Sequence, residues 1–161
     1  MSAGVGDQVP DVGAYVMSAE GPQRVSTGEL LGGGRVVLFA VPGAFTPTCS
    51  NVHLPGFVAR AGELAGKGVD TVACVSVNDP FVMAAWGAAA GADGAITMIA
   101  DPDGAFTQAM GLTTDLSAAG LGSRSRRYAA VIEDGVIRNL DVETERGVSV
   151  SSCEAVLSRL S

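Results

Sequence analysis

The stretch RVVLFAVPGAFTPTCS, residues 35–50, joins an apolar run to a turn and then to a cysteine. Residues 35–41 are continuously apolar after Arg35 and rich in β-branched side chains, which predicts a strand buried on both faces of a sheet. A Pro-Gly pair follows and predicts a turn. Thr46 and Pro47 are typical of a helix N-terminus, with Thr46 as the N-cap. The stretch therefore predicts strand, turn and helix, with Cys49 in the first helical turn.

The rest of the chain alternates predicted helices and strands in the same way. An Asp-Gly pair at 134–135 between two β-like runs is a strong hairpin signal. An N-terminal hairpin or wrap is predicted within 1–31. The predicted elements then follow in this order: a strand at 35–41, a helix at 46–68 (interrupted by Pro55), a strand at 69–77, a helix at 78–90, a strand at 96–100, a turn and short helix within 101–111, a hairpin over 127–142 and a capped helix over 151–160. This order predicts a single α/β domain, 1–161, whose sheet mixes parallel strands with an antiparallel hairpin and is flanked by helices. The thioredoxin-like fold with an N-terminal extension fits this order.

Composition excludes several classes of function. The 161 residues include 10 basic and 17 acidic side chains, with a formal net charge of −7, so no basic face for nucleic acid is expected. No run approaches the ~20 apolar residues of a membrane span, and the N-terminus lacks the pattern of a secretory signal. The three cysteines are too few and too dispersed for a disulfide scaffold. We therefore expect a cytoplasmic protein, or one of an organellar matrix if a transit peptide has been removed.

The position of Cys49 favours a reactive thiol. A helix N-terminus presents unpaired N–H groups and a partial positive charge, and both stabilise a thiolate. The hydroxyl of Thr46 lies three residues earlier and is available to cap the helix or to bond the sulfur or an incoming oxygen. Pro42 and Pro47 stiffen the loop. The alternative is that Cys49 is a small apolar residue in a buried turn, but strand, turn and helix-start thiol together indicate an activated nucleophile.

The spacing Pro42-x-x-x-Thr46-x-x-Cys49 resembles the active-site signature of the peroxiredoxins. The longer stretch PGAFTPTCSNVHLPGF (42–57) is similar to the peroxiredoxin-5, or type II, subgroup, and further matches follow in order at 67–87, 100–106 and 120–137. The resemblance implies a thioredoxin-like fold and thiol-dependent reduction of hydrogen peroxide and organic hydroperoxides, with no metal or haem. It also implies a homodimer with the active-site loop near the interface.

The resemblance assigns roles to particular residues. Cys49 is the peroxidatic thiol, which is oxidised to a sulfenic acid, and Pro42 shields the product. Because negative charge spreads over sulfur and two oxygens, fixed donors are expected from Thr46 and the Cys49 backbone. The family supplies an arginine just before an aromatic residue of a later strand, which is Arg127 here. Arg124 and Arg126 are its competitors, and strand alternation sends Arg126 and Arg127 to opposite faces.

His53 raises a second interpretation of Cys49. In a continuous helix it would share a face with Cys49, four residues earlier, as a Cys–His hydrolase pair requires. A metal site is also conceivable, but two ligands make a poor zinc site. We favour a packing or hydrogen-bonding histidine. A redox sensor without turnover and a thioredoxin-like disulfide reductase are further alternatives, although the latter expects a C-x-x-C pair that the chain lacks.

The thiol that resolves the sulfenic acid stays open. Cys153 lies at a predicted helix start, where exposure and a lowered pKa are expected, although animal-type relatives carry their resolving cysteine slightly earlier in the chain. Cys74 lies in a predicted buried strand, where cysteines are usually inert. Either internal disulfide is expected to require local unfolding. The third possibility is an external thiol from thioredoxin or glutaredoxin with glutathione.

Overall fold

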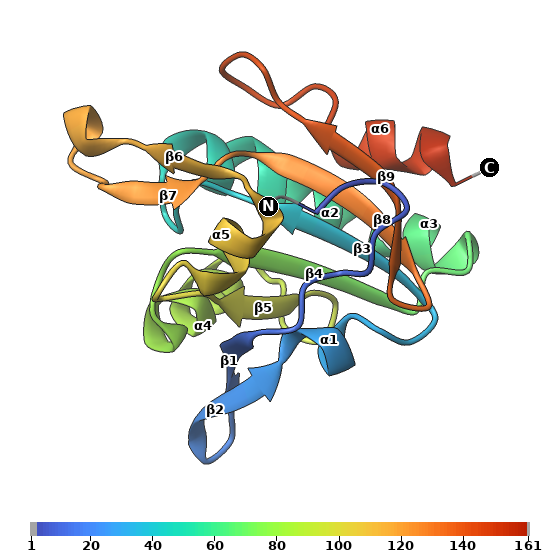
Figure 1. The fold of residues 1–161 in the computed structure, drawn as a ribbon, viewed down its shortest axis with the longest axis horizontal. Coiled ribbons are helices and arrows are strands. Elements are labelled where there is room, and N and C mark those ends of the chain that lie inside the picture. Colours follow the sequence, from blue (N-terminus) through green and yellow to red (C-terminus); the bar gives the residue numbers. More distant parts are fainter. Residues whose placement is uncertain (1–2, 161) are drawn as a thin grey trace.

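A seven-stranded mixed sheet forms the centre of the computed structural model, which describes residues 3–160 (Figure 1). Strands β3, β4 and β5 run parallel, and every other pairing in this sheet is antiparallel. The strand order is β2 (Gly21–Ser26), β1 (Gly13–Ser18), β5 (Thr97–Ala100), β4 (Thr71–Ser76), β3 (Arg35–Ala40), β8 (Tyr128–Glu133) and β9 (Val136–Val142). The predicted α/β class is confirmed.

Two apolar cores cover the two faces of the sheet. Alternation along β3 separates them, because Val37 and Phe39 face one core while Val36 and Leu38 face the other. The first core receives buried side chains from α2 (Leu54–Ala59), α3 (Ala61–Gly66), α4 (Pro80–Ala89) and α6 (Cys153–Arg159). The second receives α5 (Ala105–Met110) and the segment that ends α1 (Thr27–Leu30). Strand β3 is therefore buried on both faces, as its sequence predicts.

Several element boundaries follow from local chemistry in the predicted way. The carboxylate of Asp79 accepts the Val82 N–H and caps α4, whose first residue is a proline. Ser152 caps α6 in the same manner. Asp134 and Gly135 both take positive φ angles, 49° and 83°, which a tight hairpin turn between β8 and β9 requires.

The helix that follows the active-site loop differs from the prediction. It begins at Pro47, but residues Cys49–His53 form a π-helical turn, η1, in which the Leu54 N–H bonds the Cys49 carbonyl five residues back. Pro55 explains the widened turn, because it has no N–H to continue the ordinary ladder and its ring crowds the preceding turn. The helix also continues through Pro55 and breaks instead at Arg60, between α2 and α3, so the interruption predicted at Pro55 is placed at the wrong residue.

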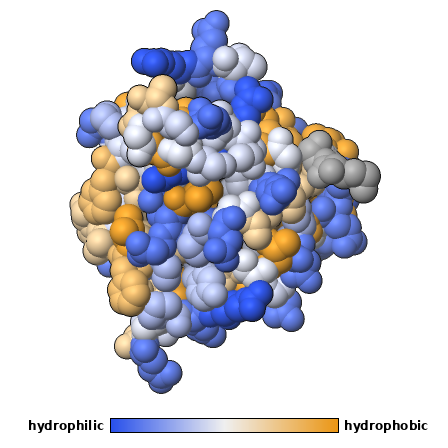
Figure 2. All heavy atoms as spheres, turned by 60° about the vertical axis from the view of Figure 1, so that its left-hand side comes forward, coloured by the Kyte–Doolittle hydropathy of each residue, from blue (hydrophilic) through white to orange (hydrophobic). Residues whose placement is uncertain are grey.

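A second small sheet was absent from the prediction. Strands β6 (Thr113–Asp115) and β7 (Ser123–Ser125) form a short antiparallel ladder around a 3₁₀ turn, η2 (Ser117–Ala119), and project from one end of the molecule (Figure 1). On the face turned toward this end, hydrophobic residues gather along one flank and are interrupted by hydrophilic ones (Figure 2). Within residues 3–160, none of the helices has the length and apolar character needed to cross a membrane.

Candidate active site

Cys49 lies where the chain leaves the sheet and enters a helix. Strand β3 ends at Ala40, a loop follows, and Cys49 is the third residue of the helix that begins at Pro47. First-turn N–H groups of a helix have no acceptor inside it, so the environment of the thiol is electropositive. The side chain is fully buried within the first core, alongside Phe39 and Leu54.

Arg127 is the cation that the structure brings against this thiol. It directly precedes β8, and its Nη2 donates to Cys49 Sγ over 3.1 Å. Its Nη1 bonds His53 Nδ1 over 2.8 Å, so the planar guanidinium spans both side chains. Arg126 is exposed, as the predicted alternation of faces requires. Of the three arginines that the sequence offers, Arg127 is the one that contacts Cys49.

His53 is a buried, neutral histidine whose two ring nitrogens are both engaged. Nε2 donates to the Ser151 carbonyl over 2.8 Å, and Nδ1 accepts from Arg127. The ring also lies against Phe39 and Phe57, with centroids 4.9 and 5.6 Å away. Burial among these groups, with the nearby Arg127 charge, lowers the pKa of His53 to about 4. Neither nitrogen is left to take a proton from Cys49, which argues against a Cys–His hydrolase pair.

Thr46 does not cap the helix with its side chain. Its hydroxyl donates to the Gly43 carbonyl over 2.7 Å, while its backbone carbonyl accepts the Ser50 N–H. The predicted side-chain cap is therefore wrong, because the tight loop offers an acceptor three residues back. With its proton committed to Gly43, the Thr46 oxygen presents lone pairs rather than a hydrogen.

Arg124 braces the loop that carries Pro42. Its Nη1 donates to the Pro42 carbonyl over 3.2 Å, and its Nε donates to the Leu121 carbonyl over 2.8 Å. Gly43 allows this approach, since a Cβ there would lie 2.9 Å from Arg124 Nη1 and 3.1 Å from the Thr46 methyl carbon. Arg124 thus links the β7 strand to the active-site loop, a role that the sequence did not reveal.

The two remaining cysteines are both buried and apart from solvent. Cys74 lies in β4, paired with Phe39 of β3, and burial raises its pKa well above the ordinary range. Cys153 is the first residue of α6 and only 3% exposed. Burial raises its pKa to about 11. The expectation of an exposed Cys153 with a lowered pKa is therefore wrong, because packing against the first core outweighs the effect of the helix start.

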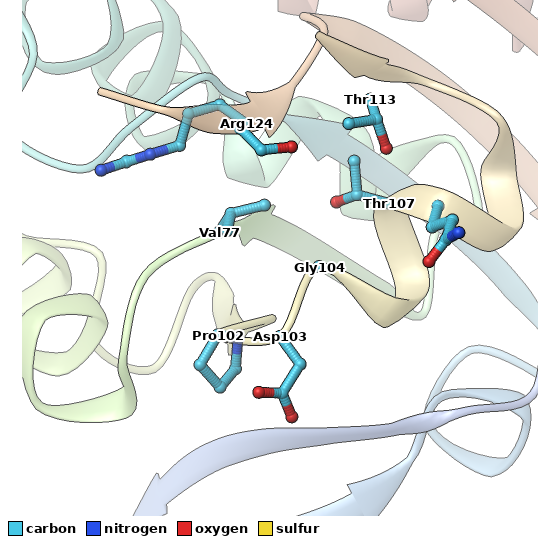
Figure 3. Close-up of a pocket in the computed structure, with 9 residues that line it drawn as sticks. Val77, Pro102, Asp103, Gly104, Thr107, Thr113 and Arg124 are labelled. Carbon is cyan, nitrogen blue, oxygen red and sulfur yellow. The ribbon is translucent and has the colours of Figure 1, made fainter. Parts of the chain in front are cut away.

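A hollow of about 470 Å³ lies beside the active-site loop and does not include Cys49. Its wall includes Val77, Asp103, Thr107, Thr113 and Arg124. Figure 3 shows the Arg124 side chain running along one side, with its guanidinium directed away from Thr107 and Thr113. The cation is thus engaged with the loop rather than with the hollow. Across residues 3–160, no group of three or more His, Cys, Asp or Glu side chains is arranged to hold a metal ion.

The groups that hold His53 through Ser151 were not predicted from the sequence. Glu143 accepts hydrogen bonds from Ser149 and Ser151, and the Ser151 carbonyl in turn accepts from His53. The signal available in the sequence was an acidic residue directly after a predicted strand, followed by the serine-rich run SVSS (149–152). That pattern by itself does not show that the serine-rich run contacts His53.

The chain is similar to known proteins over nearly its whole length. The Redoxin family model matches residues 4–157. Peroxiredoxin-2E-2, chloroplastic, from Oryza sativa is 49% identical over 161 residues, covering 97% of this chain and 72% of that protein. A structure of reduced Prx3 in complex with H₂O₂ from Vibrio vulnificus is 46% identical with a TM-score of 0.94, and 99% of each chain is covered. Peroxiredoxin 5 from Alvinella pompejana is 36% identical with a TM-score of 0.86, covering 98% of this chain and 97% of that one.

Proposed function

Because this chain belongs to the peroxiredoxins of the Redoxin family, which are thiol-dependent peroxidases, we propose that Cys49 is the thiol that its peroxide substrate oxidises. The contact between Arg127 Nη2 and Cys49 Sγ carries this proposal. A guanidinium nitrogen 3.1 Å from the sulfur is placed to bond the thiolate, which is the nucleophilic form of a cysteine. Residues 1–161 would then act as one thioredoxin-like peroxiredoxin domain.

The proposed reaction uses the contacts of the site directly. The Cys49 thiolate attacks one oxygen of the peroxide, an S–O bond forms, and the O–O bond breaks. The departing alkoxide or hydroxide takes up a proton, and Cys49 is left as a sulfenic acid. Negative charge spreads from sulfur to both oxygens, so the fixed guanidinium of Arg127 and the first-turn N–H of Cys49 are suited to stabilise it. Thr46 accepts the peroxide O–H, and Pro42 limits access to the product.

We propose that a thioredoxin- or glutaredoxin-type thiol restores Cys49. The sulfenic acid condenses with a thiol to give a disulfide and water, and a second thiol reduces that disulfide. Of the internal candidates, Cys153 requires only the short terminal helix α6 to detach, whereas Cys74 lies in β4 between two paired strands. Cys153 is therefore the better internal resolving thiol, and Cys74 packs in the first core.

A homodimer and a reducing compartment complete the proposal. Phe45 and Phe81 are 54% and 65% exposed, and the Ala44 N–H bonds Asn78 Oδ1, so the two aromatic residues lie on linked segments. Exposed aromatic residues in and near the active-site loop support association of two copies. The Oryza sativa relative is named as chloroplastic. We propose a cytoplasm or an organellar matrix, where thiol reductants are available.

The test measures peroxide consumption coupled to a thioredoxin or glutaredoxin system. We expect turnover by wild type, none by Cys49→Ser, and full turnover by Cys74→Ser. Mass spectrometry of the oxidised protein identifies any disulfide, and loss of turnover in Cys153→Ser supports internal resolution. If the wild-type thiol reacts with peroxide no faster than a small-molecule thiol, the proposed function is wrong. A redox sensor without turnover would instead show fast oxidation and no sustained consumption.

A further inference from the structure

Glu143 is a nearly buried carboxylate immediately after β9. The residue is 8% exposed, and its carboxylate accepts four hydrogen bonds. Oε2 accepts the Ser149 N–H at 2.7 Å, the Ser151 N–H at 2.9 Å and the Ser151 hydroxyl at 2.7 Å. Oε1 accepts the Ser149 hydroxyl at 2.8 Å. One carboxylate therefore fixes the course of the segment that leads into α6.

The same residue also holds Arg127 through its backbone. The Glu143 N–H donates to the Arg127 carbonyl over 2.9 Å. Beyond the carboxylate, the Ser151 carbonyl accepts from His53 Nε2, and His53 Nδ1 accepts from Arg127. The hydrogen bonds thus close a ring through Glu143, Ser151, His53 and Arg127. Such a ring defines where the guanidinium lies more tightly than a single contact would.

The carboxylate is ionised at neutral pH. Burial acts to raise the pKa of Glu143, but the hydrogen bonds from Ser151 and Ser149 outweigh it and hold this pKa at about 2. A charged acceptor makes stronger bonds than a neutral one, so the Ser151 segment is firmly held. Ser151 itself is fully buried, and its carbonyl has little freedom to turn away from His53.

We propose that Glu143 is a positioning residue that sets the tautomer of His53 and thereby aims Arg127 at Cys49. The inference rests on the proposed function of Cys49. With the Ser151 carbonyl fixed, His53 carries its proton on Nε2 and turns the Nδ1 lone pair toward Arg127. If that carbonyl moved, a proton on Nδ1 would face a guanidinium N–H, two donors would meet, and Arg127 would shift from the thiol.

A merely structural role for Glu143 predicts something different. In that case, loss of the carboxylate would lower stability but leave the His53 tautomer and the reactivity of Cys49 unchanged in the folded protein. His53 is the single histidine of the chain, so its ring nitrogen signals in a ¹⁵N NMR spectrum need no assignment by mutation. The spectrum therefore separates the two roles directly.

The experiment compares wild type with Glu143→Gln, Ser151→Ala and Asp141→Asn at pH 7. Glu143→Gln removes the charge at nearly constant shape, and Ser151→Ala removes one donor if the first variant folds poorly. Asp141→Asn is the matched control. The Asp141 carboxylate accepts from Arg159 Nη2 at 3.0 Å and Nε at 3.1 Å, which anchors α6, and it has no part in the hydrogen-bond ring through Glu143. The readouts are the His53 ring signals and the rate constant of Cys49 oxidation by hydrogen peroxide.

We expect one neutral Nε2–H form in wild type and the control, and a mixture of tautomers in Glu143→Gln. The rate constant should fall about tenfold in Glu143→Gln, less in Ser151→Ala, and remain unchanged in Asp141→Asn. An unchanged tautomer in folded Glu143→Gln, or a changed tautomer with an unchanged rate, overturns the proposal. If wild type does not react with peroxide, the proposed function fails, while the His53 spectra still decide whether Glu143 sets the tautomer.

Discussion

Replacing Arg127 with lysine tests the arrangement at Cys49 most directly. Arg127 makes two contacts in one plane, to Cys49 Sγ at 3.1 Å and to His53 Nδ1 at 2.8 Å. Lysine keeps the positive charge but carries it as a single point on a flexible stem. It therefore cannot hold both partners in this geometry. We expect Arg127→Lys to remain folded and to react more slowly with peroxide.

The size of the effect follows from the contact that is lost. A hydrogen bond that involves a charged group contributes about 1.5–3 kcal/mol, and each 1.36 kcal/mol in the barrier changes a rate tenfold. The rate constant of Cys49 oxidation should fall about 10- to 100-fold in Arg127→Lys. Arg127→Met, which also removes the charge, should fall further.

Trp86 provides the assay within the protein itself. It is the single tryptophan, and its Nε1–H donates to Ser50 Oγ over 2.9 Å, next to Cys49. Stopped-flow fluorescence after mixing with hydrogen peroxide should therefore follow oxidation of the thiol. A Cys49→Ser variant supplies the baseline, because it should give no rapid phase.

Arg126 provides the control for the Arg127→Lys prediction. Arg126 is exposed and on the opposite face of the chain, so Arg126→Lys and Arg126→Met should react within twofold of wild type. If Arg127→Lys also stayed within twofold, the guanidinium fork would have no part in the reaction. Equal losses at both positions would instead indicate a general effect of charge near the site.

Three further predictions concern Thr46, His53 and Cys153. Thr46→Val should lower the oxidation rate about tenfold, whereas Thr46→Ser should preserve it, because only the valine variant lacks the oxygen. His53 has a pKa of about 4 in the folded protein, where burial and the charge of Arg127 lower it against the opposing Ser151 hydrogen bond and Glu143 charge, and about 6.5 when unfolded. The unfolded state therefore binds more protons between these values, and the free energy of unfolding should fall by about 3 kcal/mol as pH drops from 7 to 4. Urea unfolding at pH 7 and pH 4 should show this loss of stability in wild type and not in His53→Gln. Cys153 should resist iodoacetamide in the reduced native protein and become labelled in urea; rapid native labelling would contradict its burial.

Much of the fold could be predicted because its signals are local. The apolar run at 35–41 and the Asp134-Gly135 turn each specify their structure over a few residues, and the Asp79 and Ser152 caps specify helix starts. The β6–β7 ladder escaped prediction because its strands are only three residues long. A strand of three residues is too short for an alternation of apolar and polar side chains to be recognised.

Cys49 was predictable because the pattern around it is local, whereas the contacts of the site join residues that are distant in sequence. The spacing of Pro42, Thr46 and Cys49 predicted the thiol, and the resemblance predicted Arg127, which contacts it across 78 positions. The contact of Arg124 with Pro42 spans 82 positions, and that of His53 with Ser151 spans 98. Exposure of Cys153 was predicted from its helix-start position alone. Packing of α6 onto the sheet, which no local pattern encodes, reversed that expectation.

The π turn connects the sequence to the geometry at Arg127. Cys49 and His53 are its first and last residues, and Pro55 follows two positions later. Because Pro55 lacks an N–H, the chain closes a wider turn there than an α-helix would. Both side chains nevertheless meet one planar guanidinium, with the sulfur on Nη2 and the imidazole on Nη1. A proline that looked like a simple interruption of the helix is therefore part of how the chain presents the thiol and the histidine to the same arginine.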